Sequence, residues 1–291
     1  MRKKTLKEKV NFIKLFKHVY EIKLMCKVLK LNRSTVYKHL NQKISNREID
    51  RLDLDSRIID IFDEYDSVYG APKIHELLLQ QGYYASIKRI GRYMKRLNLK
   101  SIIKIKYRPG VKSKAPDDKP NLMNKNFTTT ATNQKWVMDI TYIKTIQDGW
   151  TFLASVMDLH SRMIIGYAYE KHMRKEMVIE SIKQAIDKAG FTEGLMVQSD
   201  LGSQYLSYEV ESLLENNGII HSYSRKGSPG DNSPMEAFRS VLKREYVSRQ
   251  IFKNYEETKL GIFQYIEGFY NRKRIHGSIG YQIPIQVYYS K

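Results

Sequence analysis

An aspartate stands in the middle of an apolar β-strand pattern, and this feature constrains the fold more than any other. In the segment WVMDITYI, residues 136–143, alternate side chains fall on opposite faces of a strand, and both faces are mostly apolar. The pattern predicts a central strand that carries Asp139. An ionised carboxylate in such a strand is costly to bury unless something cationic meets it.

Two further acids stand at the end of a predicted strand and at the start of a predicted helix. Asp200 follows the apolar run LMVQS, and ligands of open α/β sheets gather at such strand ends. Glu236 lies in the first turn of a helix that Pro234 opens. Sixty residues separate Asp139 from Asp200, and thirty-five separate Asp200 from Glu236. The apolar residues at helical spacing after Pro234 are Met235, Phe238, Val241 and Leu242.

Each acid has a structural alternative when it is taken alone. Asp139 could be a hydrogen-bonded structural residue, and Asp200 could make a turn before Gly202. Glu236 could close a helix capping box with Ser233. Taken together, three carboxylates from a strand, a strand end and a helix can converge on one point. They offer only hard oxygen ligands, which suit Mg²⁺ or Mn²⁺ and not Zn²⁺, and two such ions support in-line displacement at phosphorus.

Four segments carry a familiar pattern: WVMDIT; QSDLGSQY; SRKGSPGDNSPMEAF with LKRE after it; and FYNRKRIHGSIGYQIP. Together they resemble the integrase-type Asp-Asp-Glu core of bacterial insertion-sequence transposases, specifically the second-frame product of the insertion-sequence-three family. The thirty-five-residue spacing is a hallmark of that family and is shared with retroviral integrases. Gln198 and the pair Pro229-Gly230 depart from the family pattern but leave the three acids intact.

The resemblance implies an α/β, RNase H-like catalytic core, a mixed sheet flanked by helices, over residues 127–291. It implies that Asp139, Asp200 and Glu236 bind two Mg²⁺ or Mn²⁺ ions and catalyse DNA nicking and strand transfer, which makes the chain a DNA transposase and a Mg²⁺-dependent polynucleotidyl transferase. By the same resemblance we expect a homo-oligomer on paired element ends and a fusion partner from an upstream reading frame. Arg272 and His276 of the last segment are expected to complete the active-site wall.

The charge of the chain agrees with a nucleic-acid partner. A net charge of +19 and a pI near 9.7 predict a polyanionic partner. No apolar run approaches the roughly 20 residues of a membrane-spanning helix, so DNA is favoured over a membrane surface. The single cysteine, Cys26, fits a reducing compartment and is predicted to be a small core residue. The expected location is the bacterial cytoplasm, in association with the nucleoid.

The strongest charge asymmetry lies in residues 1–45, with thirteen Lys and Arg residues against two Glu, a net +11. The run MCKVLKLNRSTVYKHL predicts two helices, a tight turn at residues 31–33 and a cap at Ser34, the form of a helix-turn-helix that enters the major groove. A plain helical hairpin with a solvated basic face is the alternative. The residues predicted to face inward are Val28, Leu31, Val36 and Leu40. The candidates for DNA contact are Arg33, Thr35, Tyr37 and Lys38.

Residues 46–106 predict a second helical, helix-turn-helix-like module. Breaks at residues 69–72 and at Gly82 separate its helices, and Ser86 caps the last one. The module resembles the one that precedes the catalytic core in the same family. Residues 107–126 lack apolar periodicity and mix Pro with Lys, so they are predicted to form a linker.

The catalytic region begins near residue 127. Turns at residues 147–149 and 160–162 predict a three-stranded antiparallel meander, and Asp158 at the second turn is predicted to be structural. The basic loop with Arg225 and Lys226 suits the DNA backbone. Lys243 shares a helix face with Glu236 and is a further candidate for a phosphate contact.

Other classes of function stay open on the residues alone. A non-catalytic, sequence-specific DNA-binding regulator would account for the helical modules and the charge, but it has no need of three acids at these spacings. A stand-alone nuclease would use the same metals without a sequence-reading N-terminal region. A decayed transposase would also keep the acids.

Overall fold

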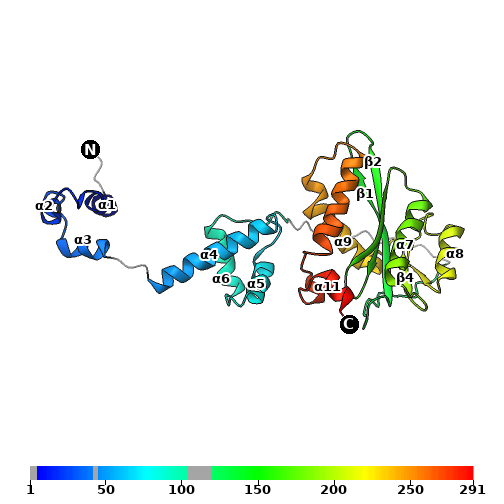
Figure 1. Ribbon diagram of the computed structural model, residues 1–291. Coiled ribbons are helices and arrows are strands. Elements are labelled where there is room, and N and C mark those ends of the chain that lie inside the picture. Colours follow the sequence, from blue (N-terminus) through cyan, green and yellow to red (C-terminus); the bar gives the residue numbers. More distant parts are fainter. Residues whose placement is uncertain (1–4, 42–44, 104–118, 291) are drawn as a thin grey trace. The chain divides into compact units, whose positions relative to one another are not determined.

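The computed structural model describes residues 5–41, 45–103 and 119–290 (Figure 1). The chain divides into two compact units, Met1–Asp60 and Ile61–Lys291. Within the described ranges, no helix is both long enough and apolar enough to cross a membrane.

The first unit contains the predicted helix-turn-helix residues. Its helices are α1 (Leu6–Phe16), α2 (Ile22–Val28), α3 (Arg33–Leu40) and most of α4 (Asn46–Glu64). The side chains buried between α1, α2 and α3 are Ile13, Met25, Cys26 and Val36, with Leu31 and Leu40 partly buried against them. The prediction that Cys26 is a core residue is therefore confirmed.

Two details of the prediction for this region are wrong. Val28 is 71% exposed, because Met25 and Cys26 already present the inner face of the short helix α2. Asn32, and not Ser34, caps α3: the Asn32 side-chain oxygen accepts a hydrogen bond from the Ser34 amide at 3.0 Å. Asn is as good an N-cap as Ser, so the sequence permitted either assignment.

The second module follows the predicted helices and breaks. After α4 come α5 (Ala71–Gln80) and α6 (Ile87–Arg96), with Pro72 in the first turn of α5. Ser86 caps α6 as predicted, since its hydroxyl accepts a hydrogen bond from the Arg89 amide at 3.2 Å.

A five-stranded mixed sheet forms the centre of the second unit. Its strands are β1 (Lys135–Lys144), β2 (Trp150–Asp158), β3 (Ile164–Glu170), β4 (Met196–Ser199) and β5 (Ile220–Tyr223), in the order β3-β2-β1-β4-β5. The predicted meander β1–β2–β3 is antiparallel, whereas β4 and β5 run parallel to β1. The strand that carries Asp139 is therefore central, as predicted.

Helices cover both faces of this sheet (Figure 1). One face packs on α7 (Lys175–Ala189) and α8 (Tyr208–Asn216). The other packs on α9 (Ser233–Glu245) and on α10 (Tyr255–Phe263) with its π-helical continuation Gln264–Tyr270. Short elements complete the unit: 3₁₀ turns at Pro229–Asn232, Val247–Arg249 and Gly277–Ile279, and α11 (Pro284–Tyr289).

The alternation of β1 decides where Asp139 points. Trp136, Met138 and Ile140 belong to the core beneath α7, whereas Val137 and Ile143 belong to the core beneath α9. Asp139 has the parity of the second set, so its carboxylate faces the α9 side. The whole arrangement is the predicted RNase H-like fold.

The core also begins earlier than residue 127. Residues 104–118 of the predicted linker lie outside the described ranges, but residues 119–126 pack against the sheet. Met123 is 2% exposed, and its amide donates to the Ser222 hydroxyl at 2.9 Å. Asn121 donates to the Asp231 carboxylate at 2.8 Å. The Pro and Lys content of this stretch gave no indication of the buried Met123 side chain or of these tertiary hydrogen bonds, to which the Tyr223 amide adds one to the Pro120 carbonyl at 3.2 Å.

Candidate active site

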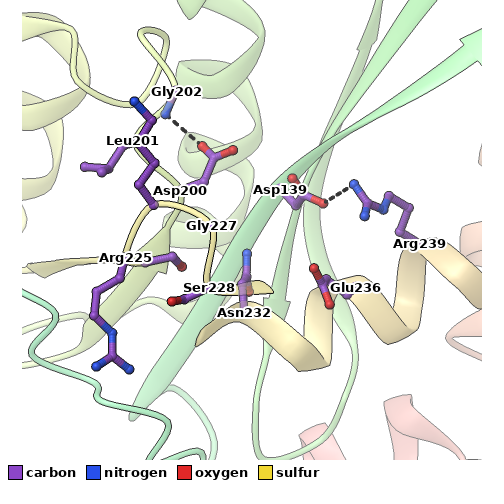
Figure 2. A pocket seen from close by; sticks show the side chains of 12 residues that line it. Asp139, Asp200, Leu201, Gly202, Arg225, Gly227, Ser228, Asn232, Glu236 and Arg239 are labelled. Atoms are coloured by element: carbon purple, nitrogen blue, oxygen red, sulfur yellow. Dashed lines mark hydrogen bonds and ion pairs between the residues drawn. The ribbon is translucent and has the colours of Figure 1, made fainter. Parts of the chain in front are cut away.

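The three predicted acids line one cavity of about 620 Å³ (Figure 2). Asp139 comes from the middle of β1, Asp200 directly follows β4, and Glu236 lies in the first turn of α9. Because β1 and β4 are parallel neighbours that pair Val137 with Gln198, two further residues along each strand lead to Asp139 and Asp200. Strand register thus brings together two acids that are sixty residues apart in the sequence.

Asn232 ties the start of α9 to the strand that carries Asp139. Its side-chain nitrogen donates to the Met138 carbonyl at 2.8 Å, in a buried position. Helix α9 begins at Ser233 with Asn232 as its N-cap residue. Ser233 is therefore inside the helix, and Glu236 faces the cavity rather than closing a capping box with Ser233.

Asp139 and Glu236 are partly buried, whereas Asp200 is exposed at the end of β4. Burial raises the pKa of Asp139 to about 6; the charge of Arg239 opposes the rise, and the charges of Asp200 and Glu236 add to it. Burial also raises the pKa of Glu236, again against the effect of Arg239. Such a group favours a cation in its midst.

The donor atoms suit a hard divalent cation. Besides the three carboxylates, Asn232 lines the cavity, and its side-chain oxygen is buried without a hydrogen-bond partner within the described ranges. Only oxygen donors are present in this set, as Mg²⁺ and Mn²⁺ prefer. Across the residues that the structure describes, no three His, Cys, Asp or Glu side chains are gathered closely enough to hold a metal ion.

Two carboxylates instead have partners within the chain. Asp139 lies 3.5 Å from the Arg239 guanidinium, and Asp200 accepts a hydrogen bond from the Gly202 amide at 2.9 Å (Figure 2). Asp200 therefore makes the turn that was its alternative role, and it also lines the cavity. The residues offer the oxygen ligands that a divalent metal ion prefers. In this structure the cation beside Asp139 is the Arg239 guanidinium.

Arg239 is the functional candidate that the sequence reasoning missed. It stands three residues after Glu236 on α9, so the two side chains share a helix face. This three-residue spacing is the feature of the sequence from which Arg239 could have been predicted. Lys243, one turn further along, was predicted. Burial and Arg239 lower its pKa, whereas the charge of Asp139 raises it, so its ammonium lies within electrostatic reach of Asp139.

The predicted basic loop lies at the rim of the cavity. Arg225 and Lys226 both line it. The Arg225 guanidinium makes two hydrogen bonds to Asp231, at 2.8 and 2.9 Å, and Figure 2 shows it directed away from the three acids. Because Asp231 is fully buried, these hydrogen bonds hold the loop in place. A DNA contact by Arg225 has to be made by donors beyond those that Asp231 occupies.

The remaining candidates lie elsewhere. Arg33, Tyr37 and Lys38 are exposed on α3, and Thr35 is half-buried. Neither Arg272 nor His276 lines the cavity of the acids: His276 packs edge-on against Tyr270, with ring centroids 6.4 Å apart.

Asp158 has the structural role that was predicted for it. It is fully buried, and its carboxylate accepts hydrogen bonds from the amide of Asn133 and from the amide and hydroxyl of Ser161.

The raised pKa of Asp139 leads to a prediction about stability. In the metal-free protein, Asp139→Asn should increase the free energy of unfolding by about 1–3 kcal/mol above pH 6, because it removes a carboxylate that the fold disfavours when ionised. The folded pKa lies above the unfolded one, so wild-type stability falls as the pH rises from about 4 to about 6, and the variant's advantage disappears at about pH 4. Denaturant unfolding across this range, with exposed Asp187→Asn as control, measures the difference. An Asp139→Asn variant that is less stable at pH 7 would contradict it.

Comparison with known proteins finds related families and structures. Two family models described as "Integrase core domain" match residues 129–229 and 217–284, and one described as "HTH-like domain" matches residues 48–107. Among solved structures, the HTLV-2 integrase catalytic core domain is 16% identical, with a TM-score of 0.43, covering 56% of this chain and 100% of that one.

Curated relatives match over most of both chains. The transposase for insertion sequence element IS904 of Lactococcus lactis subsp. lactis is 36% identical over 246 residues, which is 84% of this chain and 97% of the relative. Transposase InsF for insertion sequence IS3A of Escherichia coli K12 is 32% identical over 281 residues, or 96% and 97% of the two chains. The chain therefore belongs to the IS3 family of insertion-sequence transposases.

Proposed function

We propose that Asp139, Asp200 and Glu236 form the catalytic triad of this DNA transposase and hold two Mg²⁺ or Mn²⁺ ions. The observation that carries the proposal is the convergence of three acids, from a central strand, a strand end and a helix, on one cavity of a chain whose net charge is +19. Divalent ions held there by the three carboxylates would supply activation of an attacking oxygen and stabilisation of the leaving oxygen at phosphorus.

Two displacements account for nicking and joining. Water attacks a phosphodiester at the element end, one P–O bond forms, and the bond to the 3′ oxygen breaks to leave a 3′-hydroxyl. That hydroxyl then attacks a phosphodiester of the target: a new P–O bond forms, the bond from phosphorus to the target's 3′ oxygen breaks, and that oxygen leaves as a 3′-hydroxyl. No link to the protein is formed. Asn232 keeps Glu236 beside β1 in both steps, and Lys226 and Lys243 hold the phosphates near the acids.

The N-terminal region supplies recognition in this proposal. Helix α3 reads the element ends through Arg33, Thr35, Tyr37 and Lys38, and Arg225 contacts backbone phosphate at the rim of the cavity. We further propose DNA-binding domains over residues 1–45 and 46–106 and a catalytic core that includes the sheet-packed residues 119–126 and runs to residue 291. We also propose action as a homo-oligomer on paired ends with an upstream-frame fusion partner, and a bacterial cytoplasmic, nucleoid-associated location.

A strand-transfer assay tests the proposal. Labelled duplexes that carry the DNA flanking this gene are incubated with the protein in Mg²⁺, in Mn²⁺ or in EDTA, with and without the upstream-frame product. We expect site-specific nicks and joined products only with a divalent metal. Tight binding without any product under all conditions would indicate a regulator or a decayed copy, and unspecific cutting would indicate a nuclease.

A further inference from the structure

A second groove, of about 630 Å³, shares no lining residue with the cavity of the acids. Its walls come from residues 125–129, from the turn between β2 and β3, and from the segment around the 3₁₀ turn Gly277–Ile279. Three basic side chains line it, Lys125, His160 and Arg162, and no carboxylate does. A groove with this composition attracts an anion.

The turn between β2 and β3 holds the backbone of Arg162 in a fixed, uncommon conformation. The buried carboxylate of Asp158 accepts hydrogen bonds from the Ser161 amide at 2.8 Å and from the Ser161 hydroxyl at 2.6 Å. Arg162 itself has φ +62°, the left-handed region that side-chain-bearing residues rarely occupy. Residues in such conformations persist where surrounding contacts over-determine them, often at ligand sites.

Within the described part of the chain, the Arg162 guanidinium makes no ion pair at contact distance, although the charge of Asp158 acts on it. Its Nε is buried and makes no hydrogen bond there, and burial lowers the pKa of the group. The Asp158 carboxylate, whose charge acts on Arg162, already accepts hydrogen bonds from Ser161 and Asn133. By contrast, Arg274 is buried in a two-hydrogen-bond pair with Glu245. An arginine that is half-buried without a carboxylate is costly unless an external anion completes its contacts.

The last sequence motif forms the opposite wall of the groove. The Ser278 amide donates a hydrogen bond to the Nδ1 of His276 at 3.3 Å, and the Ser278 hydroxyl lies 3.0 Å from the same nitrogen. The His276 amide donates to the Gln282 carbonyl at 3.0 Å. Ser278 and Gln282 line the groove from this turn. Burial, together with the charges of Arg274, Arg162 and Lys73, lowers the pKa of His276 to about 3. The histidine is therefore neutral at neutral pH and adds no charge to the groove wall.

We propose that this groove binds a phosphodiester group of the DNA backbone, with Arg162 as the central contact and Lys125 and His160 beside it. Arginine presents a planar fork of donors that matches phosphate oxygens. The groove also connects with the active site: the Lys125 ammonium lies 3.7 Å from Asp231, the residue that holds Arg225 at the rim of the acid cavity. The inference rests on the DNA transposase function but not on the assignment of the triad.

The salt dependence of DNA binding tests this inference. The affinity of the full chain for a duplex of about 30 base pairs is measured in EDTA, across about 50–300 mM KCl, for wild type, Arg162→Gln and Arg162→Lys. We expect Arg162→Gln to weaken binding about tenfold at the lowest salt and to reduce the slope of log K against log[salt] by about 0.9, the value of one phosphate contact. Arg162→Lys should keep the slope. Lys183→Gln, which removes an exposed lysine of α7, is the charge-matched control and should leave the slope unchanged.

Each outcome decides a separate point. An unchanged slope in Arg162→Gln, with an unchanged melting temperature, would overturn the proposal. If inorganic phosphate stabilises the wild type but not Arg162→Gln while the slopes agree, the groove is a small-anion site and the DNA assignment fails. If Arg162→Gln unfolds more easily, Lys125→Gln replaces it and should lose slope in the same way. Because EDTA suppresses strand chemistry, failure of the triad would leave these results unaffected, whereas absence of wild-type binding would count against the DNA-binding function itself.

Discussion

Asp200→Asn, Asp139→Asn and Glu236→Gln should each lower the rate of metal-dependent nicking by at least about 10³-fold while leaving DNA affinity within about twofold. Each substitution keeps the size of the side chain but removes a charged oxygen donor from the cavity. The positions that would read DNA, on α3 and at the rim, are untouched. A change confined to the chemical step is therefore expected, with normal binding of the labelled duplex measured alongside.

The exposed acid Asp187 on α7 provides a matched control, because Asp187→Asn makes the same charge change outside the cavity. It should nick at the wild-type rate. A variant of any of the three acids that retains nicking would remove that residue from the triad. Loss of DNA binding in parallel with nicking would show instead that the carboxylates support the fold.

The double variant Asp139→Asn with Asp200→Asn adds a sharper criterion. If the acids act as one metal-binding unit, removing the second should cost little more than removing the first, since the unit is already broken. If the acids contributed independently, the rate reductions of the two single variants would multiply in the double variant. Single-turnover rates for the two single variants and the double variant separate these cases.

Much of the site could be predicted because its signals are local or periodic. The alternation in WVMDITYI placed Asp139 on a central strand, and the strand end placed Asp200 beside it. The resemblance to a known family then joined Glu236 to them. Each of these inferences needs only a strand pattern, a helix start and a spacing.

The parts that escaped prediction depend on contacts between distant residues. Asn232 binds a carbonyl ninety-four positions away, and Met123 reaches Ser222 across ninety-nine. The local sequence around either residue gives no indication of such a partner. Arg239 differs: its helical spacing from Glu236 was visible, but its ion pair with Asp139 needed the sheet register as well. The groove around Arg162 likewise joins a hairpin turn to the chain's last segment, so only the folded structure shows it.

The largest expected effect on stability comes from the far end of the helix that carries Glu236. Glu245, the last residue of α9, accepts hydrogen bonds from Arg274 at 2.8 Å on each oxygen and from the Tyr265 hydroxyl at 3.1 Å. The side chains of the ion pair are 4% and 8% exposed. The interaction with Glu245 raises the pKa of Arg274, against the effect of burial. The pair therefore fixes the C-terminal end of α9 to the segment that follows α10 and its π-helical continuation.

Glu245→Gln should lower the free energy of unfolding by about 3–5 kcal/mol, because it leaves the Arg274 charge buried without a counter-ion. Denaturant unfolding followed by fluorescence of the buried Trp136 reports on this part of the fold. The solvent-exposed pair of Lys175 and Glu209 serves as control, and Glu209→Gln should shift the midpoint very little. Adding Arg274→Met to Glu245→Gln should restore much of the loss, since an apolar side chain carries no desolvated charge. A double variant as unstable as the single one would show that packing, and not the unpaired charge, accounts for the effect.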